Sequence, residues 1–208
     1  DVDGDGTDDF VVWRPSTGTW FAFLSKGGDR AQALAGNPEH VLVRQWGLST
    51  FQPRTGDRDG DGRADLIVVD DSSGVWHTLY SSSGHNRDAA LGGNTSAGDA
   101  LQFGLPSDDY LLGDYDGDSR DDLSVYRRGI WFIRFSSSGG AVQFPFGLPD
   151  DLPGVVAAPS SGEDRRDRVE VYRPGDGNHF ERSPLGSVTV IQWGLPATDT
   201  PVGNYAHH

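Results

Sequence analysis

The chain has 208 residues, with 31 Asp and Glu against 17 Lys and Arg, which gives a formal net charge of −14. The phosphates of nucleic acids and anionic membranes repel so negative a chain, so neither is expected as a partner. The absence of cysteine excludes disulfides and thiol chemistry, and no apolar run approaches the roughly 18 residues of a membrane span, so membrane insertion is not expected.

The predicted elements repeat as four modules of short strands. In each module a first strand is followed by a turn and a second strand, and in three of the four modules Gly-x-Trp opens that second strand. A Ser/Gly turn leads to a third strand that ends in an aromatic-Gly-Leu sequence, and a short fourth strand leads into the next module. The first strands are predicted at residues 10–15, 66–70, 123–127 and 169–174. The aromatic-Gly-Leu sequences lie at 46–48, 103–105, 146–148 and 193–195.

Four-stranded modules that repeat are typical of β-propeller blades. The sequence therefore predicts an all-β fold, a propeller of four blades of four antiparallel strands. The whole chain, 1–208, is expected to form a single domain, with modules at roughly 1–51 plus 201–206, 52–108, 109–152 and 153–200. Residues 201–206 match the short fourth strand, so we expect them to pair with residues 9–14 and complete the first blade. The alternatives are an arc of a larger ring, or two chains that together make one ring.

An acidic loop of the form DxDGDxxxD precedes the first strand in three modules, with aspartates at loop positions 1, 3, 5 and 9. Two unit charges about 4 Å apart repel by about 4 kcal/mol at an effective dielectric constant of about 20. A hard cation removes this repulsion, and flexible all-oxygen coordination suits Ca²⁺ better than Mg²⁺. The backbone carbonyl at position 7 can add a neutral ligand. The predicted metal ligands are Asp1, Asp3, Asp5, Thr7, Asp9, Asp57, Asp59, Asp61, Arg63, Asp65, Asp114, Asp116, Asp118, Arg120 and Asp122.

Two other interpretations of these loops fit the sequence less well. An EF-hand or dockerin-like loop requires an acidic residue at position 12 and a helix after it, whereas Val12, Val68 and Val125 stand there and strands follow. A single Asp-Gly cluster is most simply a solvated turn. Three copies at matched positions favour calcium.

The loops and strands resemble the FG-GAP or VCBS repeat family of bacterial secreted proteins, which is related to the propeller of integrin alpha subunits. The resemblance covers essentially the whole chain and rests on the acidic loops, Phe103-Gly104, Phe146-Gly147 and Gly113-Asp114. It implies that the acidic loop joins the first two strands of a blade and holds calcium through the twelve aspartates. Loop positions 1, 3, 5 and 9 of the fourth module are Ser160, Gly162, Asp164 and Arg168. We therefore predict three calcium sites and an empty fourth.

The remaining polar residues do not suggest catalysis. The histidines occupy unrelated positions in their modules, and most acidic residues belong to the metal loops, so the chain is not expected to be an enzyme. Five tryptophans recur at equivalent places and are predicted to pack between blades; only Trp13 breaks that pattern. Candidate ligand-binding residues in the two long connections are Arg30, Asn37, His40, His85, Asn86, Arg87 and Asn94.

The predicted function is a calcium-stabilised binding or adhesion module. Its expected partner is a carbohydrate, in a lectin-like role, or an extracellular protein, and self-association is an alternative. Weak calcium loops fill only where calcium is millimolar, so we expect a secreted, extracellular or periplasmic location. An accessory domain of a secreted hydrolase is the second hypothesis, and a catalytic propeller is the third.

Overall fold

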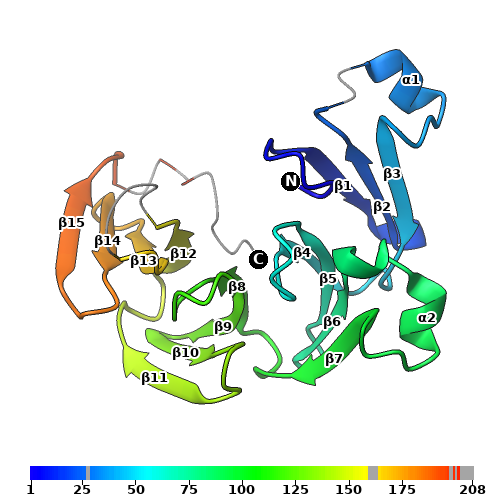
Figure 1. Cartoon of the computed structure of the whole chain (residues 1–208). Helices are drawn as coiled ribbons and strands as arrows, with labels where there is room; N and C mark the ends of the chain where they lie inside the picture. Colours follow the sequence, from blue (N-terminus) through cyan, green and yellow to red (C-terminus); the bar gives the residue numbers. More distant parts are fainter. Residues whose placement is uncertain (27–28, 159–163, 197–198, 200, 202–208) are drawn as a thin grey trace. The chain divides into compact units, whose positions relative to one another are not determined.

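The computed structural model describes residues 1–26, 29–158, 164–196, 199 and 201. The chain divides into two compact units, Asp1–Pro106 and Ser107–His208, hereafter the N-terminal and C-terminal units. Each unit contains two antiparallel sheets whose strands follow one another in chain order, as Figure 1 shows. Such a meander is the blade of a β-propeller, so the predicted all-β propeller class is confirmed.

The N-terminal unit contains a three-stranded and a four-stranded sheet. Two short α-helices and two 3-10 turns lie in its connections. The first sheet comprises β1 (Phe10–Arg14), β2 (Thr19–Phe23) and β3 (Val41–Gln45). The second comprises β4 (Gln52–Gly56), β5 (Asp65–Asp70), β6 (Val75–Leu79) and β7 (Gly98–Gln102). The helical elements are η1 (Pro15–Thr17), α1 (Arg30–Leu34), η2 (Ser81–Ser83) and α2 (Arg87–Leu91).

The C-terminal unit contains two four-stranded sheets, and in its described part no helix interrupts them. The third sheet comprises β8 (Asp109–Gly113), β9 (Asp122–Arg127), β10 (Ile130–Arg134) and β11 (Ala141–Pro145). The fourth comprises β12 (Leu152–Val156), β13 (Arg168–Arg173), β14 (Asn178–Arg182) and β15 (Val188–Gln192). All four predicted strand types therefore occur in this unit at the predicted places.

The first sheet has three strands within the described residues. The strand predicted to complete it, 201–206, lies outside them except for Pro201. Its pairing with residues 9–14, the single-domain organisation and the closure of a ring all stay predictions.

Buried central strands hold each unit together. Five of the six residues of β5 and of β9 are buried, because both faces of these strands are covered. Trp20 and Trp46 of the first sheet pack with Leu66 and Val68 of the second. In the C-terminal unit, Tyr126 and Trp131 pack with Val169 and Val171 in the same way. Burying such side chains contributes about 1.5–3 kcal/mol each.

The predicted packing role therefore holds for Trp20, Trp46, Trp76 and Trp131, all of which are buried. Trp193 is 80% exposed. In a closed ring its packing partner would be the first sheet, so its packing role stays a prediction together with ring closure. Trp13 is no surface platform, because its ring lies 6.3 Å from that of Trp20 and its Nε1 donates to the Trp46 carbonyl oxygen at 3.2 Å.

The Gly-x-Trp turn has a steric cause. Gly74 has φ +70°, and a Cβ there would lie 2.6 Å from the carbonyl oxygen of Gly104. A side chain would collide with the aromatic-Gly-Leu segment, so the two motifs of each module fit together only through glycine.

The helices α1 and α2 occupy the long β2–β3 and β6–β7 connections, where the sequence carries its extra residues. Asp29 and Asn86 cap their first turns, since each side chain accepts backbone N–H groups of the helix that follows. Among the described residues, none of the helices has the length and apolar character needed to cross a bilayer.

Candidate metal centres

The three acidic loops share one geometry, which the second loop shows most clearly. The carboxylate of Asp57, at position 1, accepts the backbone N–H groups of Gly60, Asp61 and Gly62 at 2.6, 3.2 and 2.8 Å. The loop therefore winds around its first aspartate. Asp1 and Asp114 accept the equivalent three donors in the other two loops.

Each loop brings three carboxylates together. In every cluster the oxygens that could bind a metal lie within 4.8 Å of one another. The clusters are Asp1, Asp3 and Asp5; Asp57, Asp59 and Asp61; and Asp114, Asp116 and Asp122. Such a set of hard oxygen donors fits Ca²⁺. Of the predicted position-9 ligands only Asp122 falls within a cluster, whereas Asp9 and Asp65 do not, and in the third loop Asp118 does not.

The position-9 aspartates hold the loop to the turn after the second strand. One oxygen of Asp65 accepts the Arg58 N–H at 2.8 Å, and the other accepts the Ser81 N–H at 2.7 Å. Asp9 and Asp122 make the same pair of bonds. This structural role was not predicted, although a serine follows position 9 by 16 residues in the first two modules and by 14 in the third.

Burial makes these carboxylates costly to ionise without a cation. Desolvation raises the pKa of Asp65 to about 7 and that of Asp122 to about 6, although backbone hydrogen bonds oppose the shift. Desolvation also raises the pKa of Asp57, with the Asp61 and Asp59 charges adding to it. A divalent ion would favour the charged forms.

Serine hydroxyls form a second layer around the clusters. Ser81 Oγ donates to Asp61 at 2.8 Å, and Ser82 Oγ donates to Asp59. Ser136 and Ser137 bond Asp118 and Asp116 in the same way. The sequence predicts this recurrent Ser-Ser pair only as part of a turn. In the first module Lys26 takes the place of the second serine.

The predicted role of the position-7 backbone carbonyl as a metal ligand stays a prediction. In the second loop, the position-7 side chain has a role of its own. The Arg63 guanidinium lies 2.6 Å from an Asp61 oxygen. Burial would raise the pKa of Asp61, but hydrogen bonds from Arg63 and Ser81 outweigh burial and lower it. Thr7 has no charge to pair, and Arg120 forms no ion pair within the described residues.

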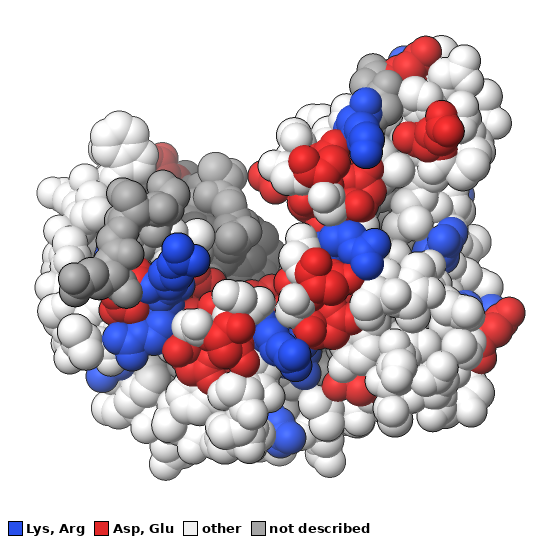
Figure 2. Space-filling view, in the orientation of Figure 1, with Lys and Arg blue, Asp and Glu red and all other residues white. Residues whose placement is uncertain are grey.

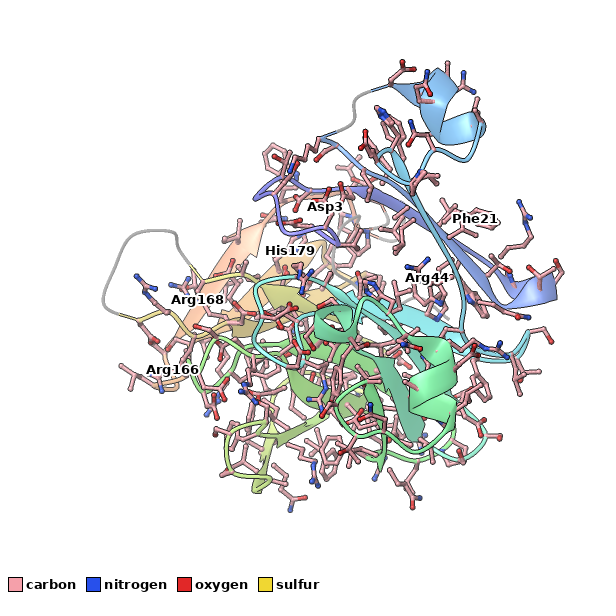
Figure 3. The ribbon with its side chains drawn as sticks, turned by 45° about the vertical axis from the view of Figure 1, so that its right-hand side comes forward. Asp3, Phe21, Arg44, Arg166, Arg168 and His179 are labelled. Carbon is pink, nitrogen blue, oxygen red and sulfur yellow. The ribbon has the colours of Figure 1, made fainter. Side chains whose placement is uncertain are left out.

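The described part of the fourth loop contains no acidic cluster. Ser160 and Gly162 lie outside the described residues. Asp164 is paired with Arg166 at 2.8 Å, and Arg168 lies 3.5 Å from Glu181 (Figure 3). Asp164 is thus the one described carboxylate at a ligand position of this loop, and the charges of Arg166 and Arg168 both act on it.

Neighbouring loops within a unit are bonded to each other. The Ala64 N–H donates to the Asp1 carbonyl oxygen at 2.7 Å, and the Asp167 N–H donates to that of Asp114 at 2.7 Å. Figure 2 shows the acidic side chains as compact red patches with basic side chains beside them. One backbone hydrogen bond therefore connects the first loop to the second, and another connects the third loop to the fourth.

Most candidate ligand-binding residues of the long connections prove to be structural. His85 is buried and bonded to the Ala64 carbonyl oxygen at 3.3 Å. Asn86 caps α2, whereas Asn94 and Asn37 each accept a backbone N–H two residues on. For His40, Nδ1 is buried with no hydrogen-bond partner among the described residues.

Arg30 and Arg87 are the exceptions, since each begins a helix and lines a hollow. The Arg87 hollow lies between the two sheets of the N-terminal unit. The Arg30 hollow lies on the open face of the first sheet, where Phe21, labelled in Figure 3, forms part of the wall.

Comparison with known proteins gives a likeness of fold. No protein-family model matches the chain, and no curated protein sequence matches it. Among solved structures, the chain is similar to virginiamycin B lyase from Staphylococcus aureus, a β-propeller, with a TM-score of 0.54 and 10% sequence identity. The match covers 95% of this chain and 55% of the lyase, so the chain spans about half the length of that propeller. At this identity the likeness shows the fold alone.

Proposed function

We propose that the chain is a calcium-stabilised binding module of the FG-GAP or VCBS type, which acts outside the cytoplasm on a carbohydrate or protein ligand. The threefold recurrence of a preformed carboxylate cluster carries this proposal. In each cluster, oxygens from three aspartates lie within 4.8 Å of one another, held by backbone N–H groups and by the Ser/Gly turn. A site so arranged costs little reorganisation when the ion binds.

The role of calcium in this proposal is structural. The second loop joins β4 to β5 and the third joins β8 to β9, whereas the first leads into β1. In all three, the position-9 aspartate ties the loop to the turn after the second strand of the module. An ion in the loop would fix both connections of a blade. With calcium at about 100 times its dissociation constant, each site would add about 2.7 kcal/mol to the free energy of unfolding.

A non-catalytic role is supported by the hydrogen bonds of two histidines, His85 and His179. His179 donates from Nδ1 to Glu170 at 2.5 Å, and its Nε2 lies 3.2 Å from the Trp193 carbonyl oxygen. His85 is likewise bonded to a backbone carbonyl. Rings engaged in this way have little capacity to accept a substrate proton. The lyase activity belongs to the structural neighbour, and a likeness of fold does not transfer it.

Calcium-dependent stability is the test. The melting temperature is measured after dialysis against chelator, then with millimolar Ca²⁺ and with millimolar Mg²⁺. We expect a rise of several degrees with Ca²⁺ and a smaller one with Mg²⁺. An unchanged melting temperature would remove the calcium proposal. The ligand class is tested separately on a glycan array with and without calcium, where uniform silence would leave an extracellular protein as the partner.

A further inference from the structure

The pocket between the two sheets of the N-terminal unit lies where the repeat is broken. It has a volume of about 320 Å³, within the range of small-molecule sites. Its walls are mainly apolar, and three polar side chains, Gln45, His77 and Arg87, reach it. The apolar walls come from Trp46, Leu48, Phe51, Val68 and Leu91.

In the C-terminal unit, an ion pair fills the corresponding position. Arg173 contacts Asp151 through two hydrogen bonds of 2.9 and 2.8 Å, and its guanidinium lies 4.3 Å from the centre of the Phe180 ring. Arg127, Asp108 and Phe132 repeat the arrangement in the third sheet. Each blade of this unit therefore carries an Arg-Asp pair over a phenylalanine.

Strand register identifies what replaces this trio in the second sheet. His77 pairs with Val68 as Phe180 pairs with Val171, and Asp70 pairs with Val75 as Arg173 pairs with Asn178. Phe51 precedes β4 as Asp151 precedes β12, and both close the same turn by donating their N–H to the leucine three residues before. The arginine, aspartate and phenylalanine are thus replaced by Asp70, Phe51 and His77.

The replacement removes both charged groups from this place. Phe51 and His77 stack with ring centres 5.5 Å apart and an interplanar angle of 3°. Asp70 turns away, because its carboxylate accepts hydrogen bonds from Ser72 and Ser73 in the adjacent turn. A flat aromatic floor therefore stands where both blades of the C-terminal unit have an ion pair.

The pocket walls are fixed by hydrogen bonds. Trp46 Nε1 donates to the His77 carbonyl oxygen at 3.0 Å, and the Trp46 carbonyl oxygen accepts the indole of Trp20 at 3.0 Å. Gly47 approaches Val68 so closely that a Cβ there would lie 2.8 Å from Cγ1. The aromatic wall is therefore rigid, and rigid apolar walls favour a rigid ring over a flexible chain.

The helix α2 supplies the charge of the pocket. Arg87 and Leu91 lie one turn apart on it and both line the pocket. Arg44 anchors the segment before the helix by donating to the Gly84 carbonyl oxygen at 3.2 Å (Figure 3). Arg87 is only 3.9 Å from its neighbour Asp88, and both side chains are exposed, so that pair holds the guanidinium weakly.

We propose that this pocket binds a small planar ring compound with a carboxylate, the ring against Trp46 and the Phe51–His77 stack and the carboxylate on Arg87. The inserted helix α2 and the three replaced residues, Phe51, Asp70 and His77, all lie around this pocket. None of them is needed for the blade fold, since the C-terminal unit lacks them all. The proposal deepens the binding role proposed above, but the pocket contacts involve none of the acidic loops. Calcium-dependent melting and ligand binding can therefore fail separately.

The test uses indole-3-acetate and its neutral counterpart indole-3-acetamide with the full chain in millimolar Ca²⁺. Binding is followed by nuclear magnetic resonance through the indole N–H signals, and affinities are measured by calorimetry. We expect indole-3-acetate to shift the Trp46 signal and to bind about tenfold more tightly than the amide, because a charge-assisted hydrogen bond is lost in the amide.

The variant Arg87→Gln should remove the preference for the acid without affecting the melting temperature. Arg30→Gln is the matched control, because Arg30 begins α1 as Arg87 begins α2, and it should keep the preference. The triple variant Phe51→Asp, Asp70→Arg, His77→Phe restores the trio of the other blades and should abolish binding. If the triple variant does not fold, the Arg87 and Arg30 pair still decides the question.

Three results would overturn the proposal. One is the absence of any shift of the Trp46 signal up to the solubility limit of the probe. Another is equal preference for the acid in Arg87→Gln and wild type. The third is displacement of the probe by neutral methyl glycosides with higher affinity, which would make the pocket a carbohydrate site.

Discussion

The second and fourth sheets are built on the same register, yet they meet their neighbours in different ways. In the fourth sheet an Arg173–Asp151 ion pair lies over Phe180, and the connections are short. In the second sheet Phe51 stacks on His77, and α2 is inserted beside a pocket. The blade fold tolerates both, so the ion pair is one way to close the junction, and its loss leaves a space that a ligand can use.

Removing the ion pair should have the largest effect on stability. In Asp151→Ala the guanidinium of Arg173 loses a carboxylate that is only 2% exposed. We expect the free energy of unfolding to fall by about 3 kcal/mol, since an unpaired, partly buried charge remains. Urea unfolding measures it. Asp150→Ala, on the exposed neighbour, is the control, and equal effects of the two variants would show that the pair contributes little.

Loss of one calcium loop should come next in size. Asp59→Asn, in the second acidic cluster, should remove the calcium-dependent part of one site, about 2.7 kcal/mol at saturating calcium. Asp164→Asn, in the fourth loop, should leave the calcium response unchanged, because Asp164 is paired with Arg166 and belongs to no acidic cluster among the described residues. The difference in melting temperature with and without Ca²⁺ measures both. A calcium response lost equally in both variants would contradict the three-site prediction.

The sequence predicted the strands well because each module repeats the same constraints. Gly74 has to be glycine to pass Gly104, and the buried strand β5 contains the continuous apolar run Leu66–Val69. The acidic loops were also predictable, because aspartate recurs at the same positions, 1, 3, 5 and 9, in all three loops. Repetition made each individual inference stronger.

The parts that were missed depend on partners far apart in the sequence. The role of Asp65 follows from the Ser81 N–H, sixteen residues away, and the stack of Phe51 on His77 joins the β3–β4 connection to strand β6. The packing of Trp13 against Trp46 spans 33 residues.

The pH dependence of stability without metal should distinguish the buried position-9 carboxylates from exposed ones. Burial raises the pKa of Asp65 to about 7 in the folded protein, whereas the ordinary pKa of an aspartate, which applies to the unfolded chain, is 3.8. The folded state therefore binds more protons than the unfolded state between these values, so stability should fall as pH rises from about 4 to about 7. Thermal unfolding in chelator measures it, and saturating Ca²⁺ should abolish the slope because the ion favours the ionised carboxylate.

The smallest expected effect concerns the wall of the pocket. Trp46→Phe keeps an aromatic ring where the third sheet naturally has Phe146, so the junction should remain packed. The variant loses the hydrogen bond from Nε1 to the His77 carbonyl oxygen, and we expect a loss of about 1 kcal/mol in urea unfolding. Because that bond fixes the ring beside the Phe51–His77 stack, ring binding should weaken more than stability does. If affinity for indole-3-acetate stays unchanged while stability falls, Trp46 supports the blade and does not form the ligand wall.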